Sequence, residues 1–364
     1  MLSEGAAAAG YMPQLDGIRA LAAGTVIIYH WWAWLDTPLP LLFDFLGIAY
    51  WGVECFFVLS GFLITLILLD IKGKNPSLRS GLWRFYARRA LRIFPPYYAT
   101  IIVGAALMPP MREVIYWHAL YLSDIYPLWH AGQWPPEAGH FWSLAVEEQF
   151  YLIWPFVVLA LPVPMLKRVA LGLCVLAPLS RYALWHRVGV EQLIIYTSPT
   201  SALDLLGFGA FLACLNSEKK LSKDSPFTER LKVAGFIALL VYPFLFLYLR
   251  ETVFFAAIDR TLLALVFGAF IAFAANGYDG LLGKTLTSSP LLWLGTVSYG
   301  LYIYHPFVPY LYNNFRRIFG LMHSSYFGAS YVQVPIMALV LFALTATSYY
   351  LLERPIRAWR KYFA

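Results

Sequence analysis

The stretch FLGIAYWGVECFFVLSGFLITLILL, Phe45–Leu69, decides the fold class of this 364-residue chain. Its 25 residues include one charged side chain, that of Glu54. An α-helix rises about 1.5 Å per residue, so about 20 mostly apolar residues cross the hydrocarbon core of a bilayer. The stretch therefore predicts a membrane-spanning helix.

The same pattern recurs on both sides of this stretch, and it predicts an all-α, polytopic membrane protein with about ten spans. No linker long enough to join a second domain interrupts the pattern, so we expect residues 12–358 to form one integral membrane domain. The predicted spans are Gly17–Leu35, Phe45–Leu69, Ile93–Met108, Phe141–Leu161, Val169–His186, Thr200–Leu215, Val233–Leu249, Phe254–Ala275, Leu291–Leu311 and Tyr331–Leu352.

Composition supports the same fold class. Hydrophobic residues make up 60% of the chain, charged residues 13%, and the mean hydropathy is +0.63. These values exclude a disordered chain, a disulfide scaffold and an ordinary water-soluble enzyme. Cys55, Cys174 and Cys214 lie scattered without metal or redox spacing, so we expect no metal. The net charge of +7 is typical of basic cytoplasmic loops, and we expect no nucleic-acid partner.

The distribution of basic residues predicts the orientation. If the ten spans alternate from an inner N-terminus, 19 Lys and Arg residues fall on the side of the termini and 7 on the other. This bias predicts that both termini are cytoplasmic. The apolar stretch Val114–Tyr121 is too short to span, so we expect an interfacial or re-entrant segment there.

Ionisable residues inside spans are costly and therefore indicate function. Arg19 and His30 are 11 residues apart in the first span, which places them on one helix face and about 16 Å apart along the axis. A cation at the cytoplasmic mouth and a deeper imidazole suit a long anionic cofactor, with a length comparable to a phosphopantetheine arm. The alternative is a snorkelling arginine and a packed histidine.

Two later segments add polar groups at a similar depth. In His140–Tyr151, the side chains of Ser143, Glu147 and Tyr151 recur at i, i+4 and i+8, with Glu148 beside them. A carboxylate here could orient or charge an imidazole, or it could belong to a buried ion pair that holds helices together. In Ser298–Pro306, Tyr302 and His305 share a face, which fits either a site or an aromatic interface belt.

The arginines after the second span form the basic part of the pattern. Arg89 and Arg92 stand one turn apart, near several other arginines, on a predicted helix at the inner membrane surface. Such a cluster can bind phosphates through bidentate bonds or simply contact anionic membrane lipid. Glu54 and Asp204 lie inside spans and are either polar contacts between helices or partners in the site.

Together, these motifs resemble the acyltransferase-3 family of integral membrane O-acyltransferases. The matching segments follow one another along most of the chain, and the segment containing Glu147 is the most specific. They are Gln14–Ala22 with His30, Gly52–Ile64, Arg89–Pro95, Phe141–Tyr151, Ser298–Pro306 and Glu353–Pro355.

The resemblance implies transfer of an acyl group, usually acetyl, from cytoplasmic acetyl-CoA or another acyl-CoA to a hydroxyl of a glycan or other glycosylated acceptor. His30 would be the catalytic imidazole, either as base or as transient acyl carrier, and Glu147 would support it or the acceptor site. Arg19, Arg89 and Arg92 would bind the phosphates of the donor. Other candidates for the site are Glu54, Ser143, Glu148, Tyr151, Tyr302 and His305.

The resemblance also implies the bacterial cytoplasmic membrane as the location. Some relatives carry a fused extracytoplasmic domain, which we do not expect here, so the protein either completes the transfer or hands the acyl group to a separate extracytoplasmic partner. Glu54 replaces a frequent Asp, and Ala202 replaces an Arg that often precedes Asp204 by two residues. The second change puts an Arg–Asp pairing at that site in doubt.

Two other functions fit the residues. Buried His, Glu and Arg side chains also occur in secondary transporters, although this sequence lacks the internal repeats that transporters often show. A membrane scaffold for glycan assembly is the other alternative, and it would tolerate loss of His30.

Overall fold

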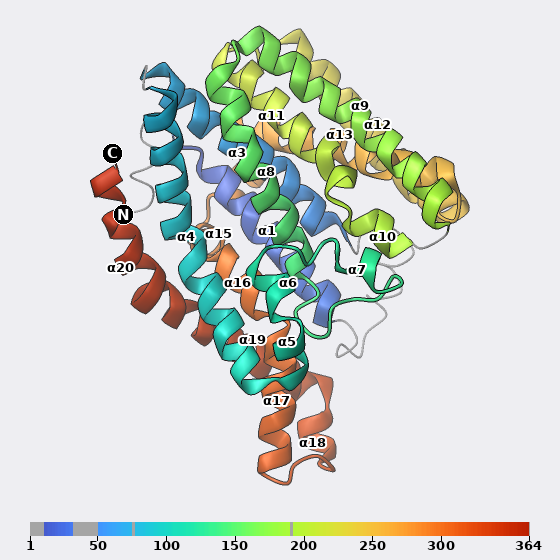
Figure 1. Cartoon of the computed structure of the whole chain (residues 1–364), viewed down its shortest axis with the longest axis vertical. Helices are drawn as coiled ribbons and strands as arrows, with labels where there is room; N and C mark the ends of the chain where they lie inside the picture. The colour runs from blue at the N-terminus through green and yellow to red at the C-terminus, as the bar shows by residue number, and fades with distance from the viewer. Residues whose placement is uncertain (1–10, 32–49, 75–76, 190–191, 364) are drawn as a thin grey trace.

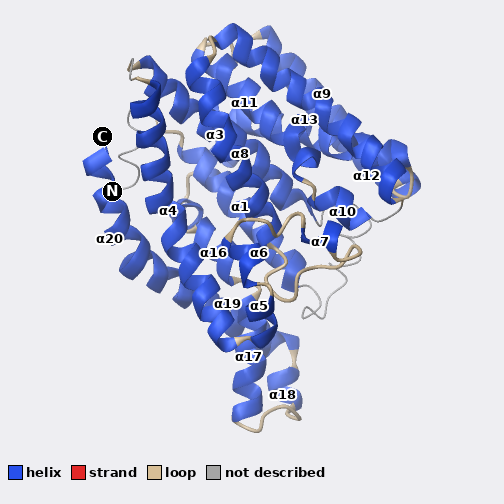
Figure 2. Ribbon diagram, viewed as in Figure 1, coloured by secondary structure: helices blue, strands red, loops and turns tan. Residues whose placement is uncertain are grey.

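The computed structural model describes residues 11–31, 50–74, 77–189 and 192–363. Helices dominate this part of the chain, and no strand occurs in it (Figure 2). The predicted all-α fold class is therefore confirmed.

Eight of the described helices are long and apolar enough to cross a membrane, and they correspond to eight of the predicted spans. Several of these helices are longer than predicted. The third span is the second half of a helix that also carries the arginine cluster, and the last continues past the predicted end. The fifth and seventh begin earlier, at Val163 and Pro226. The eight are α3 (Trp51–Gly73), α4 (Leu78–Leu107), α8 (Phe141–Ala160), α9 (Val163–Val188), Pro199–Ser217 (which contains α11, Leu203–Ser217), α12 (Pro226–Leu249), α13 (Val253–Asn276) and Ser330–Phe363 (which begins with α19, Ser330–Ser348).

The first predicted span corresponds to α1 (Pro13–Trp31), which lies near the centre of the molecule (Figure 1). Its 19 residues include Asp16, Arg19 and His30, and it does not belong to the eight strongly apolar helices. Residues 32–35 of the prediction lie outside the described residues, as do residues 45–49 of the second span.

The prediction of one continuous span over Leu291–Leu311 is wrong. The chain forms three successive helices there, α15 (Ser289–Thr296), α16 (Ser298–Tyr304) and α17 (Phe307–Ile318). The second break coincides with Pro306, which has no backbone N–H to continue the helical hydrogen bonds. The break leaves His305 at the end of α16, beside α1.

The segment between α4 and α8 forms only short helices, none of them long enough to cross a membrane, which is consistent with the interfacial or re-entrant segment expected at Val114–Tyr121. It contains the short helices α5 (Pro109–Glu113), α6 (Ile115–Ala119) and α7 (Tyr126–Trp129). The remaining short elements are α10 (Gln192–Thr197), η3 (Pro199–Ala202), α14 (Gly280–Leu286), α18 (Ser325–Gly328), the π-turn Tyr349–Glu353, α20 (Arg354–Arg357) and η5 (Ala358–Phe363).

The packing places α3 at the centre, where it contacts α1, α8, α11 and α13. Close approach of α3 and α11 depends on Gly61 and Gly209, since a Cβ on Gly61 would lie 2.0 Å from the Leu206 carbonyl oxygen. Such small residues allow membrane helices to pack backbone to backbone. On the outside, α12 exposes Phe236 and Leu240, as expected of a lipid-facing surface.

The helices separate into two groups around α1, α3 and α8 (Figure 1). One group consists of α9, α12 and α13, and the other of α4 and the C-terminal helix that begins with α19. The helix α17 and the short α18 project from the end of the molecule (Figure 1). This arrangement surrounds α1 and α8, the two helices with most of the predicted site residues.

Candidate active site

A pocket lies among α1, α3, α4, α8 and α16, and it has a cavity of about 100 Å³. It brings together side chains from segments far apart in the sequence. The predicted site residues that line it are Arg19, Arg89, Arg92, Ser143, Glu147, Glu148, Tyr151 and Tyr302, whereas His30, Glu54 and His305 lie elsewhere.

The guanidinium groups in the pocket differ in how they are paired. Arg89 lies over the Tyr151 ring at 3.8 Å and contacts Glu148 at 3.4 Å, while Arg19 contacts Asp16 at 3.5 Å. Within the described residues, Arg92 makes no hydrogen bond or ion pair with another side chain or the backbone. The pocket therefore presents cationic donors that are available to an anion.

The arginines of α4 point in different directions because of helical periodicity. Arg89 and Arg92 lie one turn apart and both line the pocket. The neighbouring Arg88 points elsewhere, and its Nε donates to the carbonyl of Phe363 at 3.0 Å. Membership in the cluster therefore does not by itself place an arginine in the pocket.

The three consecutive polar residues of α8, Glu147, Glu148 and Gln149, each contact a different set of partners. Glu147 accepts hydrogen bonds from Ser60 at 2.7 Å and Tyr151 at 3.2 Å. Glu148 faces Arg89, whereas the Gln149 amide donates to the Asp124 carboxylate at 3.0 Å and fixes the loop before α7. The carboxylates of Glu147 and Glu148 thus line the pocket, and the amide of Gln149 holds the loop before α7 against α8.

A contact between two helices separates the pocket from a group of histidines. The hydroxyls of Ser143 and Tyr302 are 2.5 Å apart, and the Tyr302 hydroxyl also donates to the His140 carbonyl at 3.0 Å. Both side chains line the pocket, but His140 and His305 do not. The pair therefore stands between the charged cavity and the imidazoles.

The three imidazoles lie close to one another. The ring of His305 is 4.8 Å from that of His30 and 5.3 Å from that of His140, measured between centroids. His30 is exposed, whereas His140 and His305 are buried. A bond from the Trp31 indole to the His305 carbonyl, 2.9 Å long, holds the ends of α1 and α16 together.

Hydrogen bonds to carbonyl groups fix the tautomers of these rings. His30 Nδ1 lies 2.9 Å from the Val26 carbonyl oxygen, and His305 Nδ1 lies 2.7 Å from that of Tyr302. Because a carbonyl oxygen can only accept, each of these nitrogens carries the hydrogen. In the neutral form, Nε2 of His30 therefore has a free lone pair that can take a proton or attack a carbonyl carbon.

Glu54 lies in a second polar region rather than in the pocket. Its carboxylate pairs with Arg260 at 3.1 Å, and both side chains are 1% exposed. Asp204 is also paired, although Ala202 had put such a pairing in doubt. Its partner is Arg181 of α9, at 2.8 Å, so a different helix supplies the cation.

Arg181 and Arg260 belong to buried polar networks, and neither was singled out from the sequence. Both belong to the seven basic residues that the ten-span arrangement puts on the side opposite the termini. For Arg260, the signal was present, since the residue lies inside the predicted span Phe254–Ala275. Arg181 likewise lies inside the predicted span Val169–His186, and its burial results from the packing of α9 against α11 and α13.

No metal site accompanies these groups in the part of the chain that the structure describes. There, no set of three or more His, Cys, Asp or Glu side chains is arranged to hold a metal ion.

The fold and these groups define a polytopic membrane protein with a charged internal pocket beside an imidazole cluster. A family model described as an acyltransferase domain matches residues 12–354, and the chain belongs to this acyltransferase family. The resemblance to the acyltransferase-3 family is thereby confirmed.

Several curated proteins are similar to the chain. It is 31% identical over 316 residues to the peptidoglycan O-acetyltransferase OatA of Listeria monocytogenes, covering 81% of this chain and 49% of that protein. It is 28% identical over 369 residues to the putative peptidoglycan O-acetyltransferase YrhL of Bacillus subtilis, covering 95% and 55%. The chain thus spans about half the length of these relatives. No solved structure matches it.

Proposed function

We propose that the protein is a membrane-bound O-acyltransferase that moves an acyl group, acetyl in the first instance, from acyl-CoA to a hydroxyl of a cell-envelope glycan. The observation that carries this proposal is the combination of an arginine-lined pocket with an imidazole whose free nitrogen is fixed by a backbone hydrogen bond. The names of the relatives support acetyl as the acyl group and peptidoglycan as the acceptor.

The arginines of the pocket would bind the donor. Guanidinium groups form strong, often bidentate, bonds with phosphate oxygens, and the phosphates of coenzyme A need several such donors. Arg92 is the best placed, because among the described residues it has no competing partner. Arg89 and Arg19 would add their outer nitrogens while keeping Glu148 and Asp16 as neighbours.

His30 would carry out the proton transfer. In a direct reaction, its Nε2 takes the proton of the acceptor hydroxyl while the hydroxyl oxygen attacks the thioester carbonyl carbon. The C–S bond then breaks, and the proton passes from His30 to the CoA thiolate. In the stepwise alternative, Nε2 attacks the carbonyl carbon, and the C–S bond breaks to release the CoA thiolate and leave an acyl group on the imidazole. The acceptor hydroxyl then attacks this acyl group, the C–N bond breaks to restore the neutral imidazole, and the hydroxyl proton passes to the CoA thiolate. In either route, the bond to the Val26 carbonyl holds the ring in the required tautomer.

The position of the Ser143–Tyr302 pair adds a requirement. Since this pair lies on the side of the pocket nearest the histidines, a bound donor would extend past it to bring its thioester to His30. Glu147, held by Ser60 and Tyr151, would then act on the pocket side of the pair and not by direct contact with His30.

The orientation completes the proposal. The excess of basic residues on one side supports cytoplasmic termini, entry of acyl-CoA from the cytoplasm and an inner-membrane location. The acceptor would approach the side on which His30 is exposed.

The test measures release of CoA thiol by the purified protein in lipid vesicles, with and without soluble glycan strands. We expect glycan-dependent release by the wild type and none by His30→Ala. A matched control is the double variant Tyr29→His/His30→Tyr, which keeps the composition but rotates the imidazole by about 100° around the helix and should also be inactive. Folded wild-type protein that releases no thiol with several acyl-CoAs and glycans would refute the proposal.

The same preparation separates the two chemical routes. Radiolabelled acetyl that stays on the quenched wild-type protein without an acceptor, but not on His30→Ala, would establish the stepwise route. Glycan acetylation without such labelling would favour direct transfer.

A further inference from the structure

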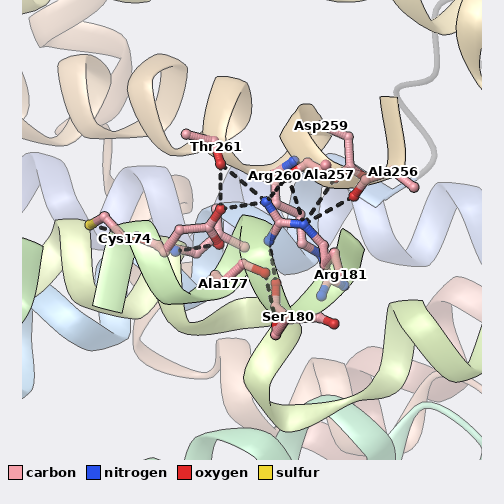
Figure 3. A network of polar contacts seen from close by, with 12 residues as sticks. Cys174, Ala177, Ser180, Arg181, Ala256, Ala257, Asp259, Arg260 and Thr261 are labelled. Carbon is pink, nitrogen blue, oxygen red and sulfur yellow. Dashed lines mark hydrogen bonds and ion pairs between the residues drawn. The ribbon is translucent and has the colours of Figure 1, made fainter. Parts of the chain in front are cut away.

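Two buried arginines, Arg181 of α9 and Arg260 of α13, differ in how many of their nitrogens have hydrogen-bond partners. Arg181 uses its nitrogens fully (Figure 3). Its Nη1 donates to the Ser201 carbonyl at 2.6 Å and its Nη2 to Asp204 at 2.8 Å and Thr261 at 3.1 Å, while its Nε lies 3.0 Å from the Ala256 carbonyl. This arginine has the bonding of a structural clamp between helices.

Arg260 is equally buried but incompletely bonded. Its Nε donates to Glu54 Oε1 at 3.1 Å. Its Nη1 and Nη2 have no hydrogen-bond partner within the described residues, and neither does Glu54 Oε2. Buried polar atoms normally have partners, because leaving them without one costs much of the hydration that they lose. Two donors and one acceptor at the same place therefore point to a ligand.

The surroundings of Arg260 indicate what kind of ligand this is. Its guanidinium lies over the ring of Tyr196 at 4.4 Å and near that of Trp142 at 5.7 Å. Glu54 offsets the charge of Arg260, so the pair as a whole does not attract an anion strongly. Sugar hydroxyls both donate and accept hydrogen bonds, and the apolar faces of sugar rings pack on aromatic side chains. Free donors, a free acceptor and aromatic rings together fit a neutral sugar.

A series of ring contacts links this place to the proposed catalytic histidine. Tyr196 contacts Tyr50 at 4.8 Å, Tyr50 contacts Tyr29 at 5.5 Å, and Tyr29 contacts His30 at 5.2 Å, all between centroids. Tyr50 and His30 are exposed, and Tyr196 is half-buried. A glycan lying along these rings would extend from Arg260 to the nitrogen that accepts its proton.

We propose that Arg260, Glu54 and Tyr196 form a subsite for a neutral sugar ring of the acceptor, at a distance from the ring whose hydroxyl reacts at His30. The inference rests on the proposed function, because it names how the acceptor of that reaction is held. Arg260 and Glu54 hydrogen-bond the hydroxyl or acetamido groups of the sugar, and Tyr196 packs on its face. The subsite is separate from the arginine-lined pocket proposed for the donor.

The test measures binding and turnover separately. Binding of a neutral N-acetylglucosamine tetramer to the wild type is measured by calorimetry in detergent, with a glucuronate tetramer as the anionic comparison. We expect Arg260→Lys to weaken binding of the neutral tetramer by about tenfold or more, the loss typical of one hydrogen bond to a charged group. Tyr196→Ala should weaken it by about two- to tenfold, because the ring that packs on the sugar is lost. Tyr196→Phe, which keeps the ring, should bind within about twofold of the wild type.

Arg181→Lys is the matched control for a buried arginine. We expect it to lower the melting temperature because it breaks the clamp, while the folded protein keeps its affinity for the neutral tetramer. Tyr196 is half-buried, so its variants keep the test valid if Arg260→Lys fails to fold.

Three results would overturn the subsite: no binding of the neutral tetramer to the wild type, tighter binding of the glucuronate tetramer, or equal binding by the wild type and the Tyr196→Ala variant. Failure of the proposed function gives a different result. The neutral tetramer would then bind through Arg260 and Tyr196, but no acyl-CoA would release thiol in the presence of any glycan.

Discussion

The arginines of the pocket allow a sharp prediction, since Arg92 and Arg89 line the same cavity but differ in their protein partners. Arg92 makes no hydrogen bond or ion pair among the described residues, so Arg92→Ala breaks no such contact. If it binds a phosphate of the donor, its loss should cost about 1.5–3 kcal/mol, the range for a hydrogen bond to a charged group, and weaken CoA binding by about 10- to 150-fold. The melting temperature without CoA should remain that of the wild type.

Arg89→Ala should behave differently. It removes the same kind of phosphate donor but also the contact with Glu148 at 3.4 Å and the stacking on Tyr151 at 3.8 Å. A partly buried carboxylate is then left without its cation, so this variant should lose both CoA affinity and thermal stability.

The assay is calorimetric titration of CoA into each detergent-solubilised variant, with melting curves of the unliganded proteins. Repeating the titration with dephospho-CoA shows whether Arg92 binds the 3′-phosphate, because the two losses would then not add. The slope of affinity against salt should also fall in Arg92→Ala, as one ionic contact is missing. Unchanged CoA affinity in a folded Arg92→Ala protein would refute the reasoning, and so would equal destabilisation by the two substitutions.

Three further predictions concern packing, the pocket carboxylate and the loop. Gly61→Ala should lower the melting temperature, because the new Cβ would lie 2.0 Å from a backbone oxygen of α11, whereas Gly73→Ala, with no atom within 4 Å of its Cβ, should not. Ser60→Ala removes one of the two donors to Glu147 and should lower the rate of acyl transfer more than the affinity for CoA, which thiol-release kinetics and titration can separate. Burial raises the pKa of the Asp124 carboxyl to about 7, so the folded protein holds a proton there that the unfolded chain releases near its usual value of 3.8. Wild-type stability should therefore fall as the pH rises between about 4 and 7, relative to Asp124→Asn, and melting curves of the two that stay parallel over this range would contradict it.

Much of the pocket could be predicted from the sequence because helical periodicity acts over short distances. The i, i+4, i+8 spacing of Ser143, Glu147 and Tyr151 placed all three on one face of α8, and each lines the pocket. Arg89 and Arg92 share a face of α4 for the same reason. These groupings are confirmed as neighbours, while the catalytic and binding roles assigned to them stay predictions.

Periodicity could not show which helices meet. Arg19 and His30 lie on one helix as predicted, yet Arg19 lines the pocket and His30 lies beyond the Ser143–Tyr302 contact. That contact joins α8 to α16, whose residues are separated by 159 positions in the sequence. A pattern within one segment carries no information about such a pairing.

The sequence by itself determined that the chain crosses a membrane as helices, because hydrocarbon leaves backbone polar groups no partner except one another and demands long apolar segments. It also marked Glu54, Glu147 and Asp204 inside those segments, but not Arg181 or Arg260. The tertiary structure alone decided their partners. It paired Asp204 with Arg181 from another helix and broke the ninth span at Pro306 beside α1. It also left two nitrogens of Arg260 without a hydrogen-bond partner among the residues described, beside Glu54 and Tyr196. The physical reason is that burial fixes which residues require partners, whereas the packing of helices distant in the sequence fixes which partners they find.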